Sequence, residues 1–171
     1  MVAQVLREVR RRGDQQVTVV GVSTVQEEVG LRGGTASSYG VDPDFGIAVE
    51  VGFASDYPDA DHKHVGEIKL GQGPVLARGP NINPALFELL TSIARDEGIP
   101  FQVMGIPRAS GTDANVMQLN RGGVATALIS VPLRYMHTPV EVLDLDDLQR
   151  AVQLLAALCA RLGPLQGFIP N

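Results

Sequence analysis

Stretches with helical periodicity alternate along the chain with short runs of β-branched and other apolar residues. The helical spacing of apolar positions predicts helices at 2–12, 84–97 and about 144–161. The apolar runs predict buried strands at 16–25, 45–53, 101–106 and 124–132. Alternating strands and helices are typical of an α/β sandwich with a mixed, largely parallel sheet.

The segments between these elements contain most of the turn signals. Gly33, Gly34 and Gly40 predict turns around at most a short helix. The glycines at 70–74 predict a turn without a nucleotide site, because no helix follows as a phosphate loop requires. We find no repeat or linker and expect a single α/β domain over 1–171. Because helix 2–12 has no capping residue or preceding strand, we expect the N-terminal part of the sheet to be missing.

Composition and charge narrow the class of protein. The chain of 171 residues has a formal charge of −5 and contains no Trp, which argues against a nucleic-acid surface. It shows neither a membrane-spanning apolar run nor the apolar core of a signal peptide, so we expect a soluble, cytoplasmic protein without a membrane partner. Its one cysteine, Cys159, excludes a disulfide framework. Any bound metal must therefore use His, Asp and Glu.

Two adjacent carboxylates, Glu27 and Glu28, follow the predicted strand 16–25. Ligand sites of α/β sheets lie beyond the carboxyl ends of strands. Neighbouring residues in extended backbone point in opposite directions, so one carboxylate could bind a metal while the other acts as a general base on water. The alternative, a solvated acidic turn, stays open at this point.

Glu50 interrupts the apolar run 45–53. A buried unpaired charge costs several kcal/mol, so this carboxylate needs a cation, an ion pair or a proton. His137 follows the predicted strand 124–132 and would reach the same sheet edge as Glu27 and Glu28 if the strands are parallel. Imidazole with carboxylates suits zinc or cobalt, although a loop histidine can equally be structural.

Further polar residues have competing interpretations. Asp113, in the segment SGTDAN, either caps a helix at 114–118 or belongs to the site. His62 and His64 have the spacing that places both side chains on one face of an extended segment. We expect them to be solvated, with adventitious metal binding at most.

Five segments together resemble a known family. They are QEEVGLRGG, AVEVGFASDYP, GEIKLGQGPVLARGP, SGTDA and PLRYMHTPVEV. The chain resembles the cocatalytic metallo-aminopeptidases, which include glutamyl aminopeptidases and self-assembling TET aminopeptidases, some of them labelled endoglucanases or cellulases. The motifs occur in family order from about residue 16 to 161. The resemblance implies a three-layer α/β/α zinc-peptidase-like domain, two divalent metals (zinc or cobalt), peptide substrates and homo-oligomers.

The resemblance also implies roles for individual residues. Glu27 matches the general base, and Glu28 and His137 match two ligands of one metal. Glu50 matches a ligand of the other metal, where many members have Asp. The substrate pocket would be shaped by Arg134, Tyr135 and Asp113.

The family pattern also contains parts that this chain does not show. We find no match to the upstream His, to the aspartate that bridges both metals, or to the inserted β-rich domain. The chain therefore looks like the C-terminal portion of a peptidase. Two hypotheses follow: a metal-dependent aminopeptidase that is impaired as this chain, or a non-catalytic structural or interaction subunit of the same fold. Glycoside hydrolysis is disfavoured, because adjacent residues can hardly bracket one bond at the ~5–9.5 Å separation it needs.

Overall fold

The computed structural model describes residues 1–163 and 168. The single-domain prediction for 1–171 also covers 164–167 and 169–171, which lie outside the described residues. The helices are α1 (Val2–Arg12), α2 (Arg32–Val41), α3 (His62–Val65), α4 (Pro84–Asp96), α5 (Ala114–Met117) and α6 (Leu145–Arg161). The strands are β1 (Phe45–Phe53), β2 (Val75–Arg78), β3 (Gln102–Gly105), β4 (Ala125–Arg134) and β5 (Val142–Leu143). Within the described ranges, none of the helices is long and apolar enough to cross a membrane.

The strands form one mixed sheet in the order β1-β4-β2-β3, with β5 paired to the end of β4. β1 runs parallel to β4 and β2 runs parallel to β3, whereas β2 and β4 are antiparallel. β4 is buried along nearly its whole length, which explains its continuous apolar sequence in place of an alternating one. The predicted mixed α/β architecture is confirmed.

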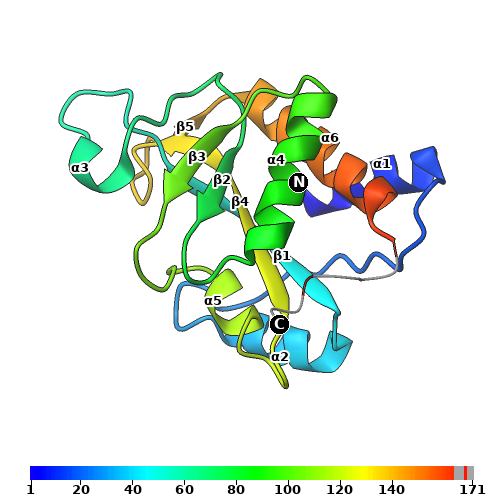
Figure 1. Cartoon of the computed structure of the whole chain (residues 1–171). Coiled ribbons are helices and arrows are strands. Elements are labelled where there is room, and N and C mark those ends of the chain that lie inside the picture. Colours follow the sequence, from blue (N-terminus) through cyan, green and yellow to red (C-terminus); the bar gives the residue numbers. More distant parts are fainter. Residues whose placement is uncertain (164–167, 169–171) are drawn as a thin grey trace.

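Apart from the short helix α3, the helices form two groups (Figure 1). α4 and α6 pack against β2 and β4, and α1 packs on α6. α2 and α5 contact each other, and α5 reaches β1 and β4. Side-chain caps define the starts of the two long helices: Asn83 accepts from the Leu86 N–H at α4, and Asp144 accepts from the Asp146 N–H at α6.

The prediction of a strand at 16–25 is wrong. These residues form no regular secondary structure and join no ladder of the described sheet. Val20 and Val25 leave 56% and 67% of their surface exposed. A strand needs a hydrogen-bonding neighbour, and β1, at the edge of the described sheet, pairs only with β4. The β-branched pattern is therefore present without the partner that would make it a strand.

The glycine-rich segment after residue 31 differs from the prediction in a similar way. Gly33, Gly34 and Gly40 lie inside α2, a helix of 10 residues, and not at turns around it. A Cβ at Gly33 would collide with the backbone of Val25, and one at Gly34 would collide with the carboxylate of Asp113. The first two glycines thus allow α2 to pack closely against its neighbours. Strand β2 and helix α3 were not predicted; the only signal for β2 is the short apolar run between Gly73 and Gly79.

Candidate active site

Glu27 and Glu28 lie in the turn that leads into α2. The N–H groups of Gly30 and Leu31 donate to the Glu27 carbonyl at 3.2 and 2.9 Å. Gln26 and Leu31 have φ angles of 57° and 55°, in the left-handed region. The expectation that extended backbone separates the two carboxylates is therefore wrong, because the chain already turns here.

The Glu28 carboxylate meets His137, which comes from the loop after β4. Glu28 Oε1 lies 3.7 Å from His137 Nε2, and both side chains are largely exposed. The ring of Phe53, at the end of β1, packs edge-on against the imidazole with ring centroids 6.3 Å apart. Residues from the turn before α2, from the end of β1 and from the loop after β4 thus meet at one place, and the approach of Glu28 to His137 is the one expected from the sequence.

Glu50 adds a third carboxylate. The pKa of Glu50 is raised to about 7, first by burial and then by the charges of Glu27, Asp113 and Glu28, against the lowering effect of a hydrogen bond from the backbone N–H of Asp113. Burial, followed by the charges of Glu28 and Asp113, also raises the pKa of Glu27, whereas His137 lowers it. The site therefore concentrates negative charge, which favours a cation.

Asp113 stands at the start of α5 but does not cap it through its side chain. The capping interpretation of this side chain is therefore wrong. The residue is only 6% exposed, and its Oδ1 atom is buried without a hydrogen-bond partner. The charge of Asp113 raises the pKa values of Glu50 and Glu27, so Asp113 belongs to the same group of carboxylates.

Arg134 and Tyr135 have contacts that the sequence did not predict. The guanidinium of Arg134 donates from Nε and Nη2 to both carboxylate oxygens of Asp56, at 2.8 and 2.6 Å. This bond from Arg134 is the main reason that the pKa of Asp56 is lowered. The ring of Tyr135 packs on Tyr57, with centroids 4.8 Å apart. Sequence analysis missed Asp56, although it lies beside Tyr57 in the quoted motif AVEVGFASDYP.

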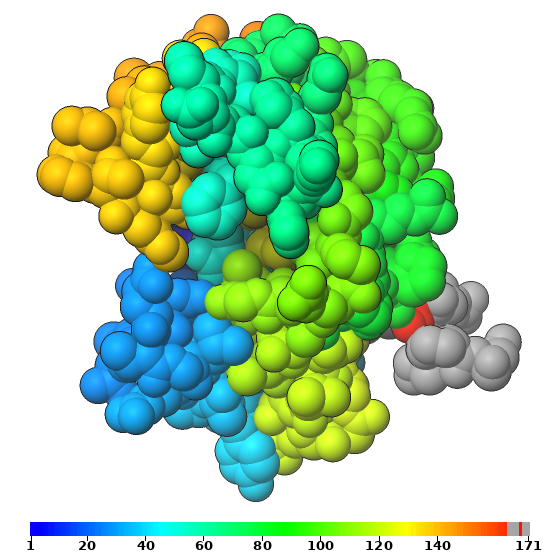
Figure 2. Space-filling model, turned by 90° about the vertical axis from the view of Figure 1, so that its left-hand side faces the viewer, coloured from blue at the N-terminus to red at the C-terminus, as the bar shows by residue number. Residues whose placement is uncertain are grey.

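Figure 2 shows a hollow on the face of the molecule formed by the segment before α2 and the loop after β4. The blue segment around α2 and the yellow-to-orange segment after β4 border it. These are the segments that contribute Glu28 and His137. The position between several loops is that of a ligand site in an α/β fold.

The donor atoms fit one metal in part. Two donors that share a tetrahedral zinc ion lie about 3.4 Å apart, given bonds near 2.0–2.2 Å. The 3.7 Å between Glu28 and His137 is close to this value. However, the described part of the chain holds no group of three or more His, Cys, Asp or Glu side chains arranged for a metal. The donor pair is thus suitable but incomplete.

His62 and His64 lie apart from this donor pair in the short helix α3. They do not share a face of an extended segment, because the backbone is helical there. The His64 imidazole lies 3.0 Å from the Asp61 carboxylate, and both are exposed.

Comparisons with known proteins show which family the sequence and the fold resemble. The family model described as M42 glutamyl aminopeptidase matches residues 1–154. The lysyl aminopeptidase of Pyrococcus furiosus is 47% identical over 156 residues, which is 91% of this chain and 44% of the relative. Among solved structures, an aminopeptidase from the archaeon Desulfurococcus kamchatkensis is 39% identical with a TM-score of 0.83, covering 93% of this chain and 46% of that one. The Pyrococcus horikoshii TET1 peptidase is 33% identical with a TM-score of 0.65, covering 81% and 40%.

The sequence and the fold therefore match proteins of one peptidase family over part of their length. The chain belongs to the M42 glutamyl aminopeptidase family. The chain spans less than half the length of these relatives.

Proposed function

We propose that this chain contributes residues to the metal-dependent active site of an aminopeptidase, which removes N-terminal residues from peptides. The observation that carries the proposal is the 3.7 Å approach of Glu28 and His137 in the family's motif order, beside three more carboxylates. Glu28 and His137 would hold one divalent metal and Glu50 would contribute to a second. Zinc or cobalt is the metal we expect.

Glu27 is the general base in this proposal. A metal held by its neighbours would supply Lewis acidity toward the scissile carbonyl and toward water. Glu27 would take the proton of the attacking water and pass it to the leaving amine. Its raised pKa suits this task, because a base whose pKa lies nearer to the working pH both accepts and returns a proton readily.

Asp113 and Tyr135 would border the substrate. The unpartnered Asp113 oxygen adds negative charge close to Glu50, which favours a ligand with a positive group such as a peptide's free amino terminus. Arg134 is engaged by Asp56, so we expect it to contribute to the shape of the pocket rather than to bind substrate charge.

A homo-oligomer is part of the proposal. The TET1 relative is described as assembling into a tetrahedron or a large octahedral shell. In this chain, β1 lies at the edge of the described sheet, and nearby valines of 16–25 are exposed. Open strand edges with apolar side chains favour association. Light scattering of the purified chain would test this, and a monodisperse monomer at high concentration would contradict it.

A second candidate function is a non-catalytic subunit of the same fold. One observation favours it: across residues 1–163 and 168, no three potential ligands are grouped to hold a metal. Two protein ligands alone bind zinc weakly, since catalytic sites usually use three. We therefore expect little or no turnover from the 171 residues alone.

A chimera distinguishes the two candidates. The part of the Pyrococcus furiosus relative that this chain does not match would be joined to this chain, and hydrolysis of aminoacyl p-nitroanilides would be measured with cobalt or zinc. We expect the chimera to bind metal and to show turnover. Glu27→Gln should abolish turnover and leave the metal content nearly unchanged, because a base that is not a ligand contributes little to affinity.

The controls decide how each result is interpreted. Glu88→Gln changes an exposed carboxylate on α4 and should leave activity unchanged. A folded, metal-loaded chimera without turnover would favour the non-catalytic subunit. Chelator-sensitive activity from the chain alone would show that a further residue completes the metal site.

A further inference from the structure

The loop that carries His137 has a strained backbone. Tyr135 and His137 both adopt the left-handed conformation, with φ angles of 58° and 66°. Non-glycine residues in this region are strained and persist only where the surroundings hold them. Within the loop, the Thr138 N–H donates to the Tyr135 carbonyl, and the His137 N–H donates to the Glu141 carboxylate at 2.8 Å. Both contacts are internal to the loop, so neither fixes its position on the sheet.

The loop is held at both ends: its last residues lead into β5, which pairs with the end of β4, and its first residues are held by side-chain contacts. Arg134, which ends β4, forms the bidentate ion pair with Asp56 in the segment after β1. The Asp56 side chain is only 15% exposed. The adjacent residues, Tyr57 and Tyr135, pack ring against ring. A paired guanidinium and carboxylate fix both distance and orientation, because two parallel hydrogen bonds are made.

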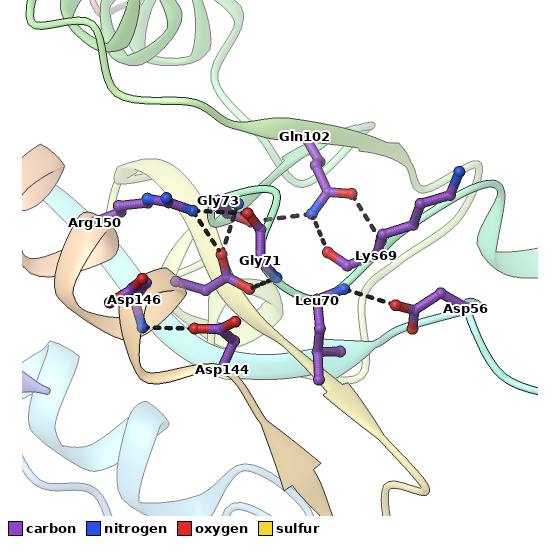
Figure 3. Close-up of polar contacts among 10 residues, drawn as sticks. Asp56, Lys69, Leu70, Gly71, Gly73, Gln102, Asp144, Asp146 and Arg150 are labelled. Carbon is purple, nitrogen blue, oxygen red and sulfur yellow. Dashed lines mark hydrogen bonds and ion pairs between the residues drawn. The ribbon is translucent and has the colours of Figure 1, made fainter.

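The turn at 69–73 contacts Asp56 and helps to fix its position (Figure 3). The Leu70 N–H donates to the Asp56 carboxylate at 3.1 Å. The same turn is anchored by the fully buried Asp147 of α6, which accepts from the N–H groups of Gly71 and Gly73, both at 2.7 Å. Arg150 donates to the Gly71 carbonyl at 2.8 Å. Polar contacts therefore connect the buried Asp147 of α6, through the turn at 69–73, to Asp56 and Arg134.

We propose that Asp56 is a positioning residue, which acts through Arg134 to hold His137 in reach of Glu28. This inference rests on the proposed function only in assigning His137 to the metal. Supporting groups around metal ligands typically change metal affinity 10–100-fold when they are removed. The Asp56 carboxylate accepts hydrogen bonds from Leu70 and Arg134, so its effect on His137 would be indirect, through Arg134.

The first test follows the loop without any metal. The proteins are the wild-type chain, Asp56→Asn, Arg134→Lys and the matched control Asp96→Asn, which breaks the 2.6 Å pair between Arg161 and Asp96 elsewhere on the molecule. The measurement is the {¹H}–¹⁵N NOE of the amides of Tyr135 to Thr138, with amides of α6 as the check on folding. We expect lower values in the loop for Asp56→Asn and Arg134→Lys, and wild-type values for Asp96→Asn.

Asn keeps one acceptor oxygen and Lys lacks the planar fork, so each variant loses the bidentate geometry. If Asp56→Asn fails to fold, Arg134→Lys decides the question. An ordered, unchanged loop in the folded variants would overturn the proposal.

The second test measures how tightly the wild-type chain and its variants bind cobalt ions. Cobalt is titrated into each protein and binding is followed in the visible spectrum. We expect Asp56→Asn to weaken binding about 10-fold or more and Asp96→Asn to leave it unchanged. His137→Ala shows whether this residue contributes to binding at all. If His137→Ala binds cobalt as the wild type does, the metal assignment fails, and the loop measurement still judges the positioning role. Wild-type affinity in Asp56→Asn, with reduced affinity in His137→Ala, would overturn the positioning role itself.

Discussion

The segment 14–31 and the layer formed by α6, β4 and the turn at 69–73 are opposite cases in one chain. The layer is closed: β4 is buried on both faces, α6 packs across it, and Asp147 satisfies the backbone of the turn. The segment 14–31 is open, with exposed valines and no ladder partner in the described structure. Residues 16–25 of the open segment and β4 of the closed layer are both apolar and rich in β-branched residues.

The difference shows which information is local. A helix makes its hydrogen bonds within itself, so a periodic pattern with a cap is nearly sufficient to place it. A strand makes its backbone hydrogen bonds with another strand. An equally clear strand pattern in the sequence therefore does not form a strand until a neighbouring strand is present. Glu27 and Glu28 lie near the end of the open segment, and the site is thus built where the fold is least enclosed.

The largest loss of stability should come from a cavity-forming substitution in the layer formed by α6 and β4. Leu158 of α6 is fully buried. Leu158→Ala should lower the free energy of unfolding by about 2–5 kcal/mol, because it removes apolar contacts and leaves a cavity. The measurement is urea denaturation followed by circular dichroism. The control is Leu145→Ala at the start of the same helix, where the side chain is 74% exposed, and a change beyond about 0.5 kcal/mol there would contradict the assigned burial.

A somewhat smaller effect is expected at the polar anchor of the same layer. Asp147→Asn replaces one of the two oxygens that receive the Gly71 and Gly73 N–H groups. We expect a loss of about 2–3 kcal/mol, since a buried donor is left without its charged acceptor. Asp146→Asn, on the adjacent exposed residue, should cost at most ~1 kcal/mol from the weakened helix-dipole interaction. Equal effects of the two variants in denaturation experiments would show that the anchor contributes little.

A pH-dependent effect tests the site between the two regions. The pKa of Glu50 is raised from 4.5 to about 7. Between these values the folded protein holds a proton that the unfolded chain has released, so stability should fall as the pH rises through this window. Glu50→Gln removes that proton uptake. After allowance for solvent screening of a partly buried group, the variant should be about 1–2 kcal/mol more stable than wild type at pH 8 and similar to it near pH 4.5.

Denaturation curves at several pH values provide the measurement. Glu88→Gln, on the exposed face of α4, should run parallel to wild type. A wild-type profile that stays flat from pH 4.5 to 8 would show that Glu50 is not held in a charge-rich site without metal.

The sequence predicted β1 at its observed residues, the three long helices within a residue or two, and the meeting of Glu28 with His137. These succeed because periodicity, caps and motif order are carried by the residues themselves. The sequence did not predict that Gly33 and Gly34 lie within a helix. Glycine is required there because Val25 and Asp113 approach the helix closely, and this contact cannot be seen in the sequence. Sequence analysis likewise missed the pairing of Asp56 with Arg134, which joins residues 78 positions apart. Nothing in a single sequence marks such a pair.

The smallest effect is expected in the open segment, and it tests the comparison most directly. Val22→Thr keeps the side-chain shape and adds a hydroxyl at a position that is 37% exposed. In the 171-residue chain it should change the free energy of unfolding by less than about 0.5 kcal/mol, because the hydroxyl can remain hydrated. The same change at Val131 of β4, which is 1% exposed, should cost about 1–3 kcal/mol, because the hydroxyl would be buried. In the chimera with the Pyrococcus furiosus relative, a neighbouring strand would enclose Val22, and its substitution should then approach the cost at Val131. If the two substitutions already cost the same in the chain alone, the segment 16–25 is a buried strand in solution, and the contrast between the regions does not hold.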